Sequence, residues 1–110
     1  MVEFLVRVSP QEAVDLVDKE IVNGSITGEK IDEHICTTEN GREVRVVVYE
    51  KHYYRADNRL TLTLTVDNLQ GFTRVHAVGG GGGHGFLRFD WGASNSFADS
   101  IERALYQYKI

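Results

Sequence analysis

Alternating hydrophobic and polar positions open the chain. Within residues 2–8 the apolar side chains take every second place, at Val2, Phe4, Val6 and Val8. A period of two is typical of a strand with one buried face. The sequence therefore predicts a strand over residues 2–8.

Helical spacing replaces this alternation directly after the first strand. Ser9, Pro10 and Glu12 have the arrangement of a capping box with proline in the first turn, which marks the start of a helix. The apolar stripe of this helix consists of Val14, Val17 and Ile21, supported by Ala13 and Leu16. Asn23-Gly24 favours a left-handed residue, so we expect the helix to end there.

Period-two alternation returns in the middle of the chain. It predicts strands over residues 26–37, 43–54, 60–66, 72–78 and 86–91. Asn40-Gly41 is typical of a two-residue hairpin turn. Leucine alternates with threonine over 60–66, so Leu62 and Leu64 are expected in the core.

The strand over 43–54 has apolar side chains on both faces. Val44, Val46 and Val48 lie on the face that we assign to the core. The opposite face carries Val47, Tyr49 and Tyr53, which we expect to point outward. A contiguous apolar and aromatic surface of this kind favours a partner.

The C-terminus returns to helical spacing. Ser96 is a suitable cap, and the apolar stripe consists of Phe97, Ile101, Leu105 and Tyr108. The resulting order is β-α-β-β-β-β-β-α, with short connections that favour antiparallel pairing. The predicted fold is α+β and two-layered, a single domain over residues 1–110 with one antiparallel sheet and two helices packed on one face. The predicted core includes Phe4, Val14, Val17, Leu62, Leu64, Phe89, Ile101 and Leu105.

Composition excludes several classes of protein. The chain has 110 residues, a net charge of −4 and one cysteine, Cys36. An acidic chain is not typical of a nucleic-acid or membrane-surface binder, so neither partner is expected. A lone cysteine excludes an intrachain disulfide, and with no signal peptide in view it favours the cytoplasm.

Two groups of residues could carry chemistry. His34 and Cys36 are two apart on a predicted strand and share a face, but no spacing brings further ligands to them, so no metal or cofactor is expected. The glycine tract of residues 79–85 is either a flexible connection or a flap over a small molecule. Residues that could contact such a ligand are His84, Gly83, Arg88 and His76.

Several short motifs resemble a family of small uncharacterised domains from Gram-positive bacteria. The matching segments are Ser9 to Ala13, Asn23-Gly24-Ser25, Val48-Tyr49-Glu50-Lys51, Tyr53-Tyr54 and Asn58-Arg59. This resemblance implies a cytoplasmic domain and supplies no catalytic residues. The order of elements also resembles TATA-binding-like and helix-grip folds, in the second of which a long C-terminal helix encloses a ligand cavity.

The function of the chain is inferred by excluding the classes of protein whose motifs are missing from the sequence. The leading hypothesis is a non-enzymatic domain that associates with itself or with another protein. The alternative is a small-ligand-binding domain with its cavity between sheet and helices and the loop of residues 79–85 as a flap; an enzyme comes third. A homodimer through Val47, Tyr49 and Tyr53 is the assembly that the pattern favours.

Overall fold

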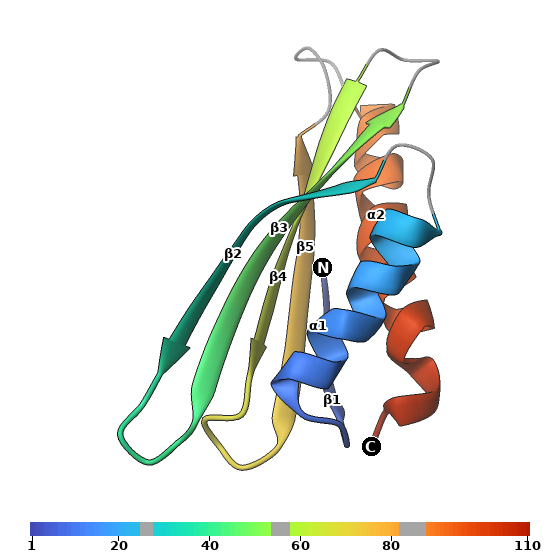
Figure 1. Ribbon diagram of the computed structural model, residues 1–110. Coiled ribbons are helices and arrows are strands. Elements are labelled where there is room, and N and C mark those ends of the chain that lie inside the picture. Colours follow the sequence, from blue (N-terminus) through green and yellow to red (C-terminus); the bar gives the residue numbers. More distant parts are fainter. Residues whose placement is uncertain (25–27, 54–57, 82–87) are drawn as a thin grey trace.

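Five antiparallel strands form one sheet, and two main helices cover one of its faces (Figure 1). The computed structural model describes residues 1–24, 28–53, 58–81 and 88–110, with the backbone alone for Tyr53, Asn58 and 88–95. The strands are β1 (Val2–Val6), β2 (Glu29–Thr37), β3 (Glu43–Tyr53), β4 (Asn58–Asp67) and β5 (Thr73–Gly81). The helices are α1 (Pro10–Asp18) with a π-helical turn η1 (Lys19–Asn23), and α2 (Arg88–Leu105) with a 3-10 turn η2 (Tyr106–Tyr108). This architecture confirms the predicted fold class.

The N-terminal helix begins as the sequence predicts, but the left-handed residue predicted at its end was wrong, because Gly24 has φ −91. The backbone amide of Glu12 donates a hydrogen bond to Ser9 Oγ over 3.1 Å, so the capping residue satisfies an amide that the helix leaves unpaired. Pro10 occupies the first turn. The apolar stripe of the helix is buried, with Val14, Val17 and Ile21 against the sheet.

The sheet has the strand order β1-β5-β4-β3-β2. The first strand therefore pairs with the last one, and the chain passes over β4 and β3 in α1 and reaches β2 after η1 (Figure 1). The leucine face of β4 lies at the centre of the core, as predicted. The fully buried residues there are Leu60, Leu62, Leu64 and Val66, which contact the same cluster as Ile101 and Leu105.

The orientation of β3 is the reverse of the prediction. Val47 and Tyr49 are fully buried, at 0% exposure, because Val47 lies opposite Leu64 and Tyr49 opposite Leu62. Opposite residues of paired antiparallel strands share a face, so the core face of β4 dictates that of β3. The half-buried residues of the outer face include Val44, Val46 and Val48. The predicted outward interface of Val47 and Tyr49 was wrong.

The predicted strand over 86–91 was also wrong, because residues from Arg88 onward belong to α2. Both sides of β5 are already occupied, by β1 and by β4, so a following strand has no neighbouring place in the sheet. Three alternating apolar residues are too short a pattern to separate a strand from a helix. The C-terminal helix consequently begins eight residues before the predicted cap at Ser96.

The glycine tract begins inside the sheet. Residues 79–81 belong to β5 and pair with β4, with Gly81 opposite Leu60. Gly81 has φ +80, and a Cβ at this position would lie 2.9 Å from the backbone oxygen of Arg59. These two constraints explain a glycine at 81, and the pairing with β4 shows that residues 79–81 of the predicted flap are strand. Residues 82–85 lie outside the described part of the chain.

The hairpin between β2 and β3 has a longer loop than predicted. The amide of Thr38 donates to the Arg42 oxygen over 2.8 Å, and the amide of Gly41 donates to the Thr38 oxygen over 3.1 Å. These bonds enclose the three residues 39–41, and Gly41 has φ +83. A three-residue loop that ends in a left-handed glycine is a common hairpin connection.

The two edges of the sheet differ in their protection. The C-terminus covers the end of the β1 edge, since Arg7 N donates to Tyr108 O over 2.9 Å and Ile110 N donates to Leu5 O over 3.0 Å. The other edge strand, β2, pairs with β3 on one side, and no described residue pairs with its other side. Seven of its nine residues are exposed. The open edge is therefore β2.

Candidate functional site

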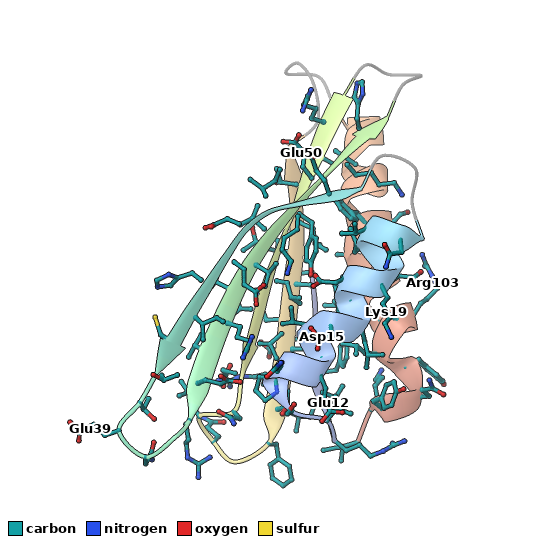
Figure 2. All side chains as sticks on the ribbon, in the orientation of Figure 1. Glu12, Asp15, Lys19, Glu39, Glu50 and Arg103 are labelled. Atoms are coloured by element: carbon teal, nitrogen blue, oxygen red, sulfur yellow. The ribbon has the colours of Figure 1, made fainter. Side chains whose placement is uncertain are left out.

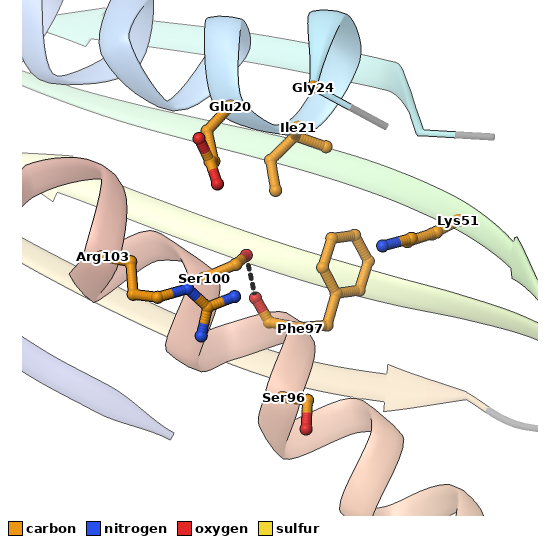
Figure 3. Close-up of a pocket in the computed structure, with 8 residues that line it drawn as sticks. All are labelled: Glu20, Ile21, Gly24, Lys51, Ser96, Phe97, Ser100 and Arg103. Carbon is orange, nitrogen blue, oxygen red and sulfur yellow. Dashed lines mark hydrogen bonds between the residues drawn. The ribbon is translucent and has the colours of Figure 1, made fainter. Parts of the chain in front are cut away.

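A cavity of about 270 Å³ lies between the helices and the sheet. Its walls come from η1, from β3 and from the C-terminal half of α2 (Figure 3). The residues lining it are Glu20, Ile21, Gly24, Lys51, Ser96, Phe97, Ser100 and Arg103. Pockets for drug-sized ligands span about 300–1,000 Å³, so this volume suits a smaller molecule.

Two buried apolar side chains shape the cavity. Ile21 of η1 and Phe97 of α2 point toward each other and are almost fully buried (Figure 3). Lys51 reaches in from β3, and its Nζ lies 5.9 Å from the centre of the Phe97 ring. Ser100 Oγ donates a hydrogen bond to the Phe97 backbone oxygen over 2.6 Å. These contacts give the cavity a mainly polar lining with a small apolar part.

Opposite charges enter the cavity from its two helical walls. Glu20 points from η1 toward α2, and the guanidinium of Arg103 lies on the α2 side (Figure 3). Both side chains are exposed. Within the part of the chain that the structure describes, neither forms an ion pair or a side-chain hydrogen bond. The cavity is therefore lined by one carboxylate and one guanidinium that do not form an ion pair with each other.

A second polar cluster joins β2 to α1 on the helix-covered face. Lys30 Nζ lies 2.9 Å from Asp18 Oδ2 and 2.6 Å from Glu33 Oε1. Arg45 Nη1 lies 3.3 Å from Glu33 Oε2, and Tyr49 donates its hydroxyl proton to Asp18 Oδ1 over 2.5 Å. We call these five residues the β2–α1 network.

The pKa values of the network follow from its contacts. Burial alone would lower the pKa of Lys30, but hydrogen bonds to Glu33 and Asp18 outweigh it and raise the pKa. The hydrogen bond from Lys30 lowers the pKa of Glu33. Burial, together with the hydrogen bond to Asp18, raises the pKa of Tyr49 far above its ordinary value. Tyr49 is therefore a protonated hydrogen-bond donor, and the network is suited to structural attachment of β2.

His34 and Cys36 lie side by side on the uncovered face of β2. Cys36 Sγ is 3.1 Å from His34 Nε2, which confirms that the two side chains share a face. Both residues are exposed, and the thiol is free. No group of three or more potential metal ligands occurs among the described residues.

Of the four predicted ligand-binding residues, only His76 is described with its side chain, and it does not line the cavity. His76 lies on the outer face of β5, because its neighbours Val75 and Ala77 are buried against the helices. Its predicted place in a cavity between sheet and helices was wrong, since the cavity is on the opposite face. Gly83 and His84 lie outside the described residues, and only the backbone of Arg88, at the start of α2, is described.

Two of the three predicted interface residues are likewise not on a free surface. Val47 and Tyr49 are in the core, and the side chain of Tyr53 is outside the described set. Sequence reasoning also missed Glu20 and Arg103. They belong to different helices, and no local motif links one to the other.

The fold and its surfaces define a two-layer α+β domain with one open sheet edge. The sequence pattern of a family of unknown function, DUF6054, matches residues 1–109, and the chain belongs to this family. The chain matches no curated protein and no solved structure. Membership confirms the predicted relation to an uncharacterised domain family. Among the described residues, no helix is long and apolar enough to span a membrane.

Proposed function

We propose that this chain is a non-enzymatic, self-associating domain, and that two copies pair through the open edge of β2. The observation that supports this proposal is the exposure of β2. Ile31 is 51% exposed and Ile35 is 45% exposed on a nine-residue edge strand. A long edge strand with exposed apolar residues is a template for pairing with another strand.

The second copy is the occupant that the sequence of β2 favours. When β2 pairs antiparallel with its own copy around Glu33, Ile35 lies next to the bulge of the second copy, where the register of β2 shifts between Lys30 and Asp32 and Ile31 is the extra residue. Asp32 then lies opposite His34, and both of these residues are on the outer face. Two-fold symmetry repeats each contact, as in the commonest homodimers. The strand is therefore complementary to itself in the polar pair of Asp32 and His34, and the exposed Ile35 of each copy lies near the bulge of the other.

One feature at the two-fold axis opposes this pairing. Glu33 of each copy meets its counterpart there, and like charges directly opposite each other are destabilising. Within each copy, however, Glu33 is 2.6 Å from Lys30 Nζ and 3.3 Å from Arg45 Nη1. These cations offset the charge of Glu33 before the second copy arrives.

Sedimentation at micromolar concentration tests the association. We expect wild type at twice the chain mass of 12.4 kDa. Ile35→Lys should give a monomer, because it places a charge on the pairing edge. Leu69→Lys is the matched control, since Leu69 is 42% exposed but lies in the turn between β4 and β5. A wild-type monomer, or an Ile35→Lys dimer, would contradict the proposal.

A charge exchange tests the register. Asp32→His alone puts two imidazoles opposite each other, and His34→Asp alone puts two carboxylates opposite each other. Each cross-strand pair contributes about 0.2–1 kcal/mol, so each variant should weaken dimerisation by about tenfold. An equimolar mixture of the two variants restores opposite partners at every contact and should form heterodimers. A mixture that associates no better than either variant would exclude this register.

The cytoplasm is the location that we propose for this domain. Cys36 is free and exposed, close to His34. An exposed free thiol is best maintained in a reducing compartment. Alkylation of intact cells with a membrane-permeant reagent tests the location: Cys36 should be labelled as a thiol, and an intermolecular disulfide would contradict the proposal.

A further inference from the structure

Two unneutralised opposite charges face one small cavity on the helix side of the molecule. Glu20 and Arg103 line it from η1 and α2, and neither has a hydrogen-bonding or ionic partner among the described residues. The other ionic side chains of the inner face behave differently. Asp18, Lys30 and Glu33 neutralise one another within the β2–α1 network.

We propose that this cavity binds a small zwitterion, a free α-amino acid, with its ammonium group at Glu20 and its carboxylate at Arg103. A guanidinium matches the geometry of a carboxylate and donates two parallel hydrogen bonds to it. A carboxylate only accepts hydrogen bonds, so Glu20 is suited to an ammonium group. A zwitterion satisfies both side chains at once, whereas a simple anion or cation satisfies one.

The remaining lining residues suit the rest of such a ligand. Ile21 and Phe97, both almost fully buried, provide the small apolar part of a mainly polar lining, against which an aliphatic side chain can pack. Lys51 is the second cation of the lining, and its Nζ faces the Phe97 ring at 5.9 Å. Arg103 is therefore the cation that we assign to the carboxylate. The volume of about 270 Å³ is sufficient for one amino acid.

Amide chemical shifts of the full-length protein test this site directly. L-Leucine is the probe, and its two analogues are isopentylamine, which lacks the carboxylate, and 4-methylpentanoate, which lacks the ammonium group. We expect leucine to shift the amide signals of Gly24, Ser96 and Ser100, and each analogue to bind at least about tenfold more weakly. Equal binding of leucine and either analogue would overturn the proposal, as would the absence of shifts at these amides.

Paired variants assign the two charges. Glu20→Gln should weaken the binding of leucine by about tenfold and leave the affinity for 4-methylpentanoate unchanged. Arg103→Gln should weaken the binding of leucine by a similar factor and leave the affinity for isopentylamine unchanged. Lys19→Gln and Glu39→Gln are matched controls, because Lys19 precedes Glu20 on η1 and Glu39 lies at the far tip of the β2–β3 hairpin (Figure 2). Equal losses in the controls would show that net charge, not this site, governs binding.

This inference is independent of the proposed dimer. The cavity and the β2 edge share no residue. The Ile35→Lys variant should therefore bind leucine as wild type does. If wild type binds leucine and the monomeric variant does not, the dimer proposal stands and the independence of the cavity from the dimer is contradicted.

Discussion

At the scale of single residues, the burial of a side chain in this fold depends on the packing and hydrogen-bond partners available on the helix-covered face. Tyr49 shows this most clearly, because its ring is fully buried and its hydroxyl donates to Asp18 Oδ1. A buried tyrosine needs such a partner for its polar end. Nothing in the local sequence links position 18 to position 49, so a strand face with a tyrosine was predicted to be exposed.

Leu64 provides the residue-scale prediction. It is fully buried at the centre of β4, opposite Val47. Leu64→Ala should lower the free energy of unfolding by about 2–5 kcal/mol, because it removes buried methyl groups and leaves a cavity. Thr63→Ala, on the outer face of the same strand, should change it by less than about 0.5 kcal/mol. Urea denaturation measures both, and comparable losses would contradict the assigned faces.

At the scale of elements, β2 is the strand that depends most on electrostatic attachment. It contacts the sheet on one side only, and the β2–α1 network joins it to the helix through Lys30 and Asp18. Glu33 completes this attachment by accepting from Lys30 over 2.6 Å. Buried apolar contact is small here, since most of the strand is exposed. The attachment should therefore respond to pH.

Acid should weaken this attachment of β2. The folded pKa of Glu33 lies below its ordinary value of 4.5, so its contribution is present above that value and is lost as pH falls through the folded pKa. Urea denaturation between pH 7 and pH 3 should show Glu33→Gln less stable than wild type at pH 7, with the two curves converging in acid.

Lys30→Met is the companion variant for that experiment, because the hydrogen bond from Lys30 is the largest cause of the lowered pKa of Glu33. This variant should reduce the loss of the free energy of unfolding between pH 7 and pH 3. If Glu33→Gln and wild type stay parallel from pH 7 to pH 3, the network does not stabilise the fold in this way.

At the scale of the whole molecule, the sheet has a protected edge and an open one. The C-terminal residues Tyr108 and Ile110 cover the end of β1, whereas no described residue pairs with the outer edge of β2. Central strands lose their hydrogen bonds only in large unfolding events, and open edges lose them in small local ones. Stability should therefore decrease across the sheet from β4 and β5 toward β2.

Hydrogen exchange of the backbone amides checks this gradient. We expect the slowest exchange in β4 and β5 and the fastest strand exchange in β2. Pairing of two copies should slow amide exchange in β2 as protein concentration rises, while the exchange rates in β1 stay constant. Ile35→Lys should remove the concentration dependence. Exchange in β2 that is independent of concentration in wild type would contradict the dimer.

The sequence by itself determined the local elements and the class of the fold. The capping box at Ser9, the helical stripe of α1 and the leucine alternation of β4 are complete within short segments, so their period alone identifies them. Consecutive strands with short connections then favour an antiparallel sheet, and two amphipathic helices need one face of it.

Only the tertiary structure decided which face of β3 is buried and where the chain leaves the sheet. Residues 44 to 48 of β3 are apolar on both faces except at Arg45, so the hydrophobic pattern does not distinguish the buried face from the exposed one. The register with β4 decides it by placing Val47 opposite Leu64. Residues 88–91 became helix because β1 and β4 already flank β5. The cavity and the open edge depend on these same choices. Each joins residues distant in sequence, and the energy of such contacts exists only after the strands have paired.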